Sequence, residues 1–240
     1  MSAPLWPYLA LPGLLVGIAA RSTVWYLAVG LPPRRTCPAC STVPNRTLSP
    51  VRLFIGRCRV CGYAPPPPAF VPELLGAGGF ALAGWIGGGG FRVAALCWLV
   101  AFSLSAVLVD AAIQRLPDVL TWPCLAGVLV LLLGQTLVAG SAADGVRTVL
   151  AGCVVAGFFL TLALIADMGL GDVKLASSLG AVLGYVSWHA VLAGLTAGFC
   201  IAGLHGVRVI ATRGRGLSTQ LPLGPALLAG TVLVLALTAR

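Results

Sequence analysis

Two acidic residues have the type and setting to do chemistry. The chain holds six Asp and Glu residues among 240; Asp110 ends an apolar run, and Asp172 follows Gly169 and Gly171 and precedes Lys174. Two carboxyl groups that share one proton can act together, because the ionised member takes a proton from water while the neutral member donates to a carbonyl oxygen. That is aspartic-protease chemistry. The pattern predicts a catalytic pair, with glycines that let the backbone approach a substrate strand closely.

Each acid also has a simpler interpretation. Asp110 could face headgroup water at a helix end, and Asp172 could be the N-cap of the following helix. Lys174 could pair with Asp172 or extend its ammonium to the interface. Asp118, in a Leu-Pro-Asp turn, competes with Asp110 for the first catalytic position, although its place favours shaping the loop.

The composition places these acids in a membrane protein. Hydrophobic residues make up 59% of the chain and charged residues 9%, and the mean hydropathy is +1.01. A soluble domain carries about a quarter charged residues, whereas a membrane span needs about 20 apolar ones. We expect an all-α, polytopic membrane bundle of about eight spans. Its apolar segments lie near residues 4–30, 71–90, 93–112, 120–139, 147–166, 173–187, 188–207 and 221–239, and the sixth is short enough to be re-entrant.

Positive charge predicts the orientation. The net charge of +9 would suggest nucleic acid in a soluble protein, but in a membrane protein Lys and Arg stay on the cytoplasmic side, opposite anionic lipid headgroups. With residues 31–69 in the cytoplasm, eleven Lys and Arg fall inside and three outside. We therefore expect a multi-pass protein of the inner (plasma) membrane without a nucleic-acid partner, and with Asp110 and Asp172 at its cytoplasmic face.

Four cysteines in the polar loop have the spacing of a zinc site. They form two Cys-x-x-Cys pairs, Cys37 with Cys40 and Cys58 with Cys61. Two such turns complete a tetrahedral thiolate shell with no open position, so we predict a structural zinc ion. Disulfides or unused thiols are the alternative, and a cytoplasmic location disfavours disulfides. The predicted organisation is a first span at residues 1–30, a zinc-binding loop at 31–69 and a membrane core at 70–240.

In this order, these motifs resemble those of the type IV prepilin peptidase family, membrane aspartic proteases with a Gly-x-Gly-Asp motif. The resemblance covers about residues 10–235. The segments that carry it are 56–62 (GRCRVCG), 72–75 (PELL), Asp110 followed by 116–121 (LPDVLT), 169–175 (GLGDVKL) and 221–225 (LPLGP).

The resemblance implies cleavage of the short basic leader of type IV prepilins or pseudopilins, the subunits of pili and secretion machines, at the cytoplasmic face. Many members then N-methylate the new terminus with S-adenosylmethionine. Here Gly17-Ile-Ala-Ala-Arg21 stands where the family has a Gly-Ser-Phe-Leu-Asn type stretch, which leaves methylation open. The site residues it implies are Asp110 and Asp172 as the catalytic pair, with Gly169, Gly171, Lys174, Asp118 and Glu73 in support.

Two rival functions use the same residues differently. A proton-coupled transporter would use the acids as a relay, but it would place them near the bilayer midplane. A non-catalytic scaffold of a secretion machine would keep the zinc loop and would not need the acids at all.

Overall fold

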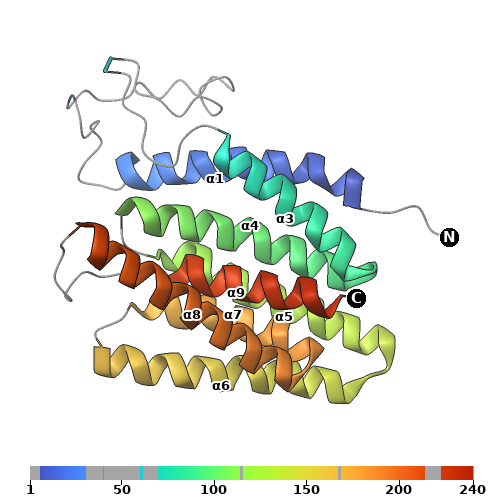
Figure 1. Ribbon diagram of the computed structural model, residues 1–240. Helices are drawn as coiled ribbons and strands as arrows, with labels where there is room; N and C mark the ends of the chain where they lie inside the picture. Colours follow the sequence, from blue (N-terminus) through green and yellow to red (C-terminus); the bar gives the residue numbers. More distant parts are fainter. Residues whose placement is uncertain are drawn as a thin grey trace.

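The computed structural model describes residues 6–30, 40, 60–61, 70–113, 116–166, 169–213 and 223–239, and every regular element among them is an α-helix. The helices lie side by side in one bundle (Figure 1). The all-α prediction is confirmed for these residues, and each helix overlaps one predicted apolar segment. The helices are α1 (Trp6–Gly30), α3 (Val71–Gly87), α4 (Gly90–Ile113), α5 (Asp118–Ala139), α6 (Ala142–Ala166), α7 (Leu170–Val186), α8 (Trp188–Arg213) and α9 (Leu223–Thr238).

Five of the described helices, α1, α4, α5, α6 and α8, are long and apolar enough to cross a membrane. The other three, α3, α7 and α9, have 17, 17 and 16 residues. At about 1.5 Å per residue they are somewhat shorter than the roughly 30 Å of a bilayer's hydrocarbon core. Membrane-spanning capacity is thus confirmed for five helices, and the total of eight spans stays a prediction.

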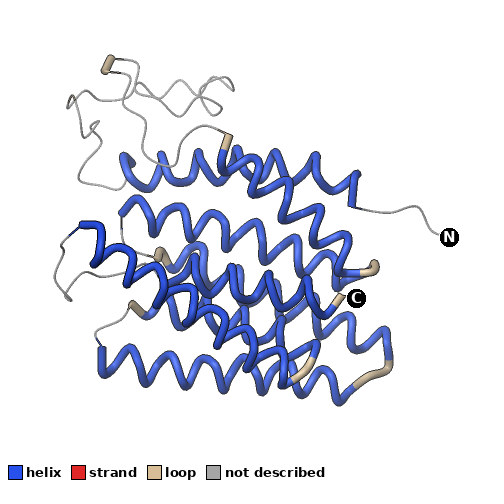
Figure 2. Tube along the Cα trace, in the orientation of Figure 1, coloured by secondary structure: helices blue, strands red, loops and turns tan. Residues whose placement is uncertain are grey.

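Successive helices alternate in direction (Figures 1 and 2). α4 and α6 therefore end where α5 and α7 begin. Asp110 lies in the last turn of α4 and Asp172 in the first turn of α7. Both acids consequently lie at the same end of the bundle, as the alternation of the apolar segments predicts, and not at its middle.

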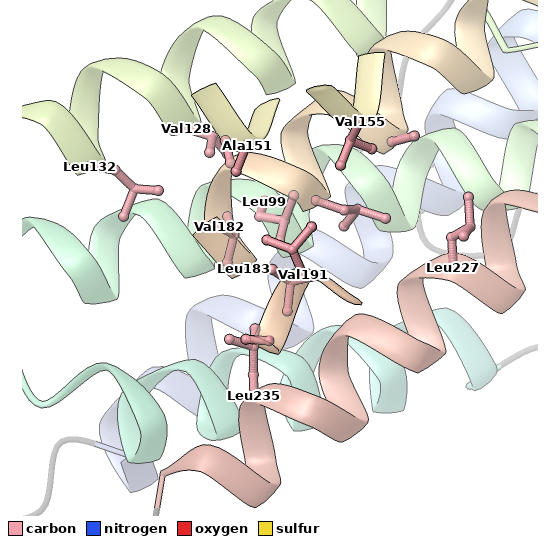
Figure 3. Packing of buried hydrophobic residues seen from close by; sticks show 14 of the residues in the cluster. Leu99, Val128, Leu132, Ala151, Val155, Val182, Leu183, Val191, Leu227 and Leu235 are labelled. Carbon is pink, nitrogen blue, oxygen red and sulfur yellow. The ribbon is translucent and has the colours of Figure 1, made fainter. Parts of the chain in front are cut away.

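Helix α7 is the interior element of the bundle. Twelve of its 17 residues are buried, and it contacts α4, α5, α6, α8 and α9. Figure 3 shows Val182 and Leu183 of α7 among side chains of the neighbouring helices, including Leu99, Val155 and Leu235. Asp172 is therefore carried by the helix that the rest of the bundle encloses.

The far end of α7 is closed by an arginine from α6. Arg147 donates from Nε to the carbonyl oxygen of Gly184 at 2.6 Å and from Nη2 to that of Tyr185 at 2.7 Å. The same guanidinium pairs with Asp144 at 2.6 Å. The last carbonyls of a helix have no partner within it, so Arg147 satisfies them from the neighbouring helix and lets α7 end inside the bundle.

Candidate active site

Asp110 is buried and Asp172 is partly buried at their shared end of the bundle. Asp110 is only 8% exposed. The Oδ1 atom of Asp172 is buried, and no hydrogen-bond partner reaches it from the described residues. A buried carboxylate oxygen without a partner is costly, which makes this point a candidate site.

The charge of one aspartate acts on the other. Asp172 belongs to α7, which is not one of the five span-capable helices. Burial, and secondarily the negative charge of Asp110, raises the pKa of Asp172 to about 6. Two carboxyl groups of which one disfavours the ionisation of the other can hold one proton between them at a pH below this value. This is the electrostatic state that acid–base hydrolysis requires.

The simpler interpretations of the two acids are wrong in this structure. Asp110 does not face the headgroup region openly, because it is buried. Asp172 is not an N-cap: the N-cap of α7 is Gly169, and the backbone N–H of Asp172 donates to the carbonyl oxygen of Gly169 at 3.1 Å. Lys174 does not pair with Asp172, since its ammonium bonds to Asp118 instead.

The two glycines of the motif have different surroundings. A Cβ built on Gly171 would lie 2.5 Å from the Cβ and 2.9 Å from the carbonyl oxygen of Leu116, which is too close for any side chain. A Cβ on Gly169 would meet only Asp172 Oδ2, at an ordinary 3.8 Å. Gly171 therefore allows the start of α7 to rest directly on the segment that precedes α5.

Asp118, the rival to Asp110, is a surface residue. Its side chain is 66% exposed and bonds to Lys174. Lys174 Nζ also lies 5.0 Å from the ring centroid of Trp122, a residue that the sequence reasoning missed. The signal was available, because Trp122 follows Asp118 by four positions and so shares its helix face. Of the two candidates, Asp110 has the desolvated setting that suits a catalytic acid.

Glu73 lies in a separate ion pair. Its Oε2 is 2.6 Å from Arg21 Nη2, and the two side chains are only 13% and 11% exposed. Helices α1 and α3 are in close contact beside this ion pair, because a Cβ built on Gly17 would lie 2.7 Å from the backbone nitrogen of Glu73. The pair joins α1 to α3 and accounts for the Arg within the first apolar segment. Among the described side chains Glu73 is paired with Arg21, and no ion pair or hydrogen bond joins it to Asp110 or Asp172.

Only two of the four predicted zinc ligands belong to the described residues. Cys40 and Cys61 belong to the described residues, whereas Cys37 and Cys58 lie outside them. Across the described ranges, no group of three or more His, Cys, Asp or Glu side chains is placed to hold a metal ion. The zinc site stays a prediction.

Comparison with known proteins agrees with the motifs. The type IV leader peptidase family matches residues 95–207, a range that contains Asp110, Asp118, Asp172 and Lys174. A prepilin leader peptidase/N-methyltransferase of Dickeya chrysanthemi is 35% identical over 181 residues, which are 69% of this chain and 62% of that protein. This chain thus leaves more than a third of the Dickeya protein uncovered.

Two further relatives carry the same name. The protein of Aeromonas salmonicida (strain A449) is 31% identical over 220 residues, which are 85% of this chain and 71% of the relative. The protein of Klebsiella pneumoniae is 34% identical over 167 residues, which are 66% of this chain and 71% of the relative. No solved structure matches the chain. With membrane-spanning helices and these relatives, the chain is a multi-pass membrane protein that belongs to the type IV leader peptidase family.

Proposed function

We propose that this protein is a membrane aspartic endopeptidase that removes the basic leader of type IV prepilins or pseudopilins at the cytoplasmic face of the inner membrane. The observation that carries the proposal is the placement of two desolvated carboxyl groups at one end of the bundle: Asp110 is 8% exposed, and no described residue hydrogen-bonds the buried Oδ1 of Asp172. The family relationship supplies the substrate class.

The pair accounts for hydrolysis without any other group. The ionised aspartate takes a proton from water as the water oxygen bonds to the scissile carbonyl carbon, and the neutral aspartate donates its proton to the carbonyl oxygen. The tetrahedral intermediate then returns that proton to the pair, the C–N bond breaks, and the leaving nitrogen takes the proton gained from water. One water is consumed, a carboxylic acid and an amine are formed, and the pair again holds one proton.

The position of the pair fits a substrate that is itself a membrane helix. The acids lie where α4 ends and α7 begins, so a prepilin could reach them from within the bilayer while its charged leader stays at the cytoplasmic surface. The lipid bilayer would thus hold the apolar helix of the substrate, and the proposed peptidase core comprises residues 70–240.

N-methylation is the less supported of the two activities in the relatives' names. S-adenosylmethionine would supply the methyl group when bound. The first span of this chain places Arg21 in a buried pair with Glu73, at the stretch where its sequence departs from the family pattern. Mass measurement of the mature N-terminus decides whether a methyl group is added.

The proposed zinc ion is tested by metal content alone. Purified wild-type protein is expected to hold one zinc ion per chain, bound by Cys37, Cys40, Cys58 and Cys61, because four thiolates at this spacing form a closed tetrahedral shell. Cys37→Ser is expected to lose most of this zinc, and Cys97→Ser, which alters a cysteine of α4, is expected to retain it. A wild-type protein that contains no zinc ends the proposal.

Co-expression with a prepilin tests the function as a whole. Wild-type protein is expected to convert the prepilin to a faster-migrating form that lacks the basic leader. A transporter or a scaffold would leave the prepilin at full length in the same cells. Full-length prepilin beside stably expressed wild-type protein would therefore favour those two alternatives.

A further inference from the structure

Lys174 has two partners that the hydrolytic scheme does not use. Its ammonium bonds to the carboxylate of Asp118 and lies 5.0 Å from the ring centroid of Trp122, and its side chain is only 18% exposed. Both partners belong to α5, whereas Lys174 belongs to α7. The side chain therefore crosses between two helices that begin at the same end of the bundle.

The electrostatics of α7 alone do not explain this lysine. Lys174 is the fifth residue of its helix, and side chains lean toward the helix N-terminus. A cation near a helix N-terminus meets the positive end of the helix dipole and is disfavoured. Asp118, in the first turn of α5, is an acid at the favourable end of its own helix. The ammonium is thus held in place by α5.

This contact and a second one lie on either side of Asp172. One residue before it, the backbone of Gly171 rests on Leu116; two residues after it, Lys174 bonds to Asp118. Asp172 Oδ1 itself has no hydrogen-bond partner among the described residues. The placement of this carboxylate is therefore set mainly by the backbone that carries it. That backbone lies against Leu116, just before α5, on one flank and is tied to α5 through Lys174 on the other.

We propose that Lys174 is a positioning residue for hydrolysis. Through Asp118 and Trp122 it fixes the start of α7 and so sets Asp172 relative to Asp110. The same ion pair keeps the ammonium away from Asp172, where a bound cation would hold the carboxylate ionised and remove the shared proton. The catalytic part of this inference rests on the proposed function, and the structural part does not.

The proposal is tested with purified protein in liposomes and a purified prepilin as substrate. The four variants are Lys174→Met, Lys174→Arg, Asp118→Asn and the double variant Lys174→Met/Asp118→Asn. Lys174→Met is expected to lower kcat by about 10- to 100-fold, because misplacement by about 1 Å can cost that much, with KM changed less than about twofold. Lys174→Arg keeps the charge and is expected to retain most of the rate. The double variant is expected to lose no more than Lys174→Met alone, since the two residues act as a unit.

Hydrogen exchange of the amides at the start of α7 supplies a readout that does not depend on activity. Lys174→Met is expected to speed exchange there, and Lys174→Arg is not. If wild-type protein cuts the prepilin and Lys174→Met cuts it equally fast, the positioning role is overturned. If neither the wild-type protein nor any variant cuts the prepilin, the proposed function fails, but the structural role of Lys174 is still tested by hydrogen exchange. Unchanged exchange in Lys174→Met would overturn the claim that Lys174 holds the start of α7 in place.

Discussion

Asp172→Asn is expected to lower the rate of leader cleavage by at least about a thousandfold, and Asp110→Asn by a similar factor. Asparagine keeps the shape of the side chain but cannot take a proton from water or hold the proton that the pair shares. The measurement is the initial rate of leader release by purified protein in liposomes. Circular dichroism of each variant checks that the helical bundle is intact.

Asp118→Asn is the matched comparison for the first position. Because Asp118 is exposed and acts through Lys174, its loss is expected to cost about 10- to 100-fold, in line with misplacement of a catalytic group. Asp118 would displace Asp110 from the pair if Asp118→Asn were inactive and Asp110→Asn active. Undiminished cleavage by both Asp110→Asn and Asp172→Asn would rule out the pair itself.

Gly171→Ala is expected to reduce cleavage by about a hundredfold or more, although it adds a single methyl group. That methyl would lie 2.5 Å from Leu116 Cβ and 2.9 Å from its carbonyl oxygen, so the start of α7 must move away from the segment that precedes α5. Asp172 is the next residue and moves with it. The measurement is kcat for leader release, with KM determined in the same experiment.

Gly157→Ala is the control for this substitution. Gly157 also lies within a helix, α6, and a Cβ there meets no atom within 4 Å. It is expected to cleave at the wild-type rate and to gain up to about 1 kcal/mol of helix stability. If Gly171→Ala were as active as Gly157→Ala, the close contact of Gly171 with Leu116 would have no bearing on the site.

The pattern of apolar residues predicts where the helices lie, but it misplaces a helix end where charged residues belong to the helix. The segment predicted at residues 120–139 corresponds to α5 at Asp118–Ala139. The next was predicted to begin at residue 147, whereas α6 begins at Ala142. Asp144 lies between the two predicted segments and Arg147 at the start of the second, but both belong to α6, where they pair with each other and Arg147 closes the end of α7.

The candidate site can be predicted from the sequence only where a single residue is unusual for its surroundings. An acid beside an apolar run is expensive enough to stand out alone, so Asp110 and Asp172 could be singled out. The ion pairs around the site could not be predicted, because Lys174 and Asp118 are 56 positions apart and Arg21 and Glu73 are 52 apart. These ion pairs depend on which helices are neighbours and on the register between them. The local pattern of apolar residues contains no information on either.

The most direct test of the central claim is the mass of the products that the purified protein makes. Wild-type protein in liposomes, given a prepilin and no methyl donor, is expected to yield a leader and a mature pilin whose masses sum to that of the substrate plus one water. Asp110→Asn and Asp172→Asn are expected to yield neither product. A prepilin that stays intact beside folded wild-type protein, or fragments that also form with both Asn variants, would contradict hydrolysis by this aspartate pair.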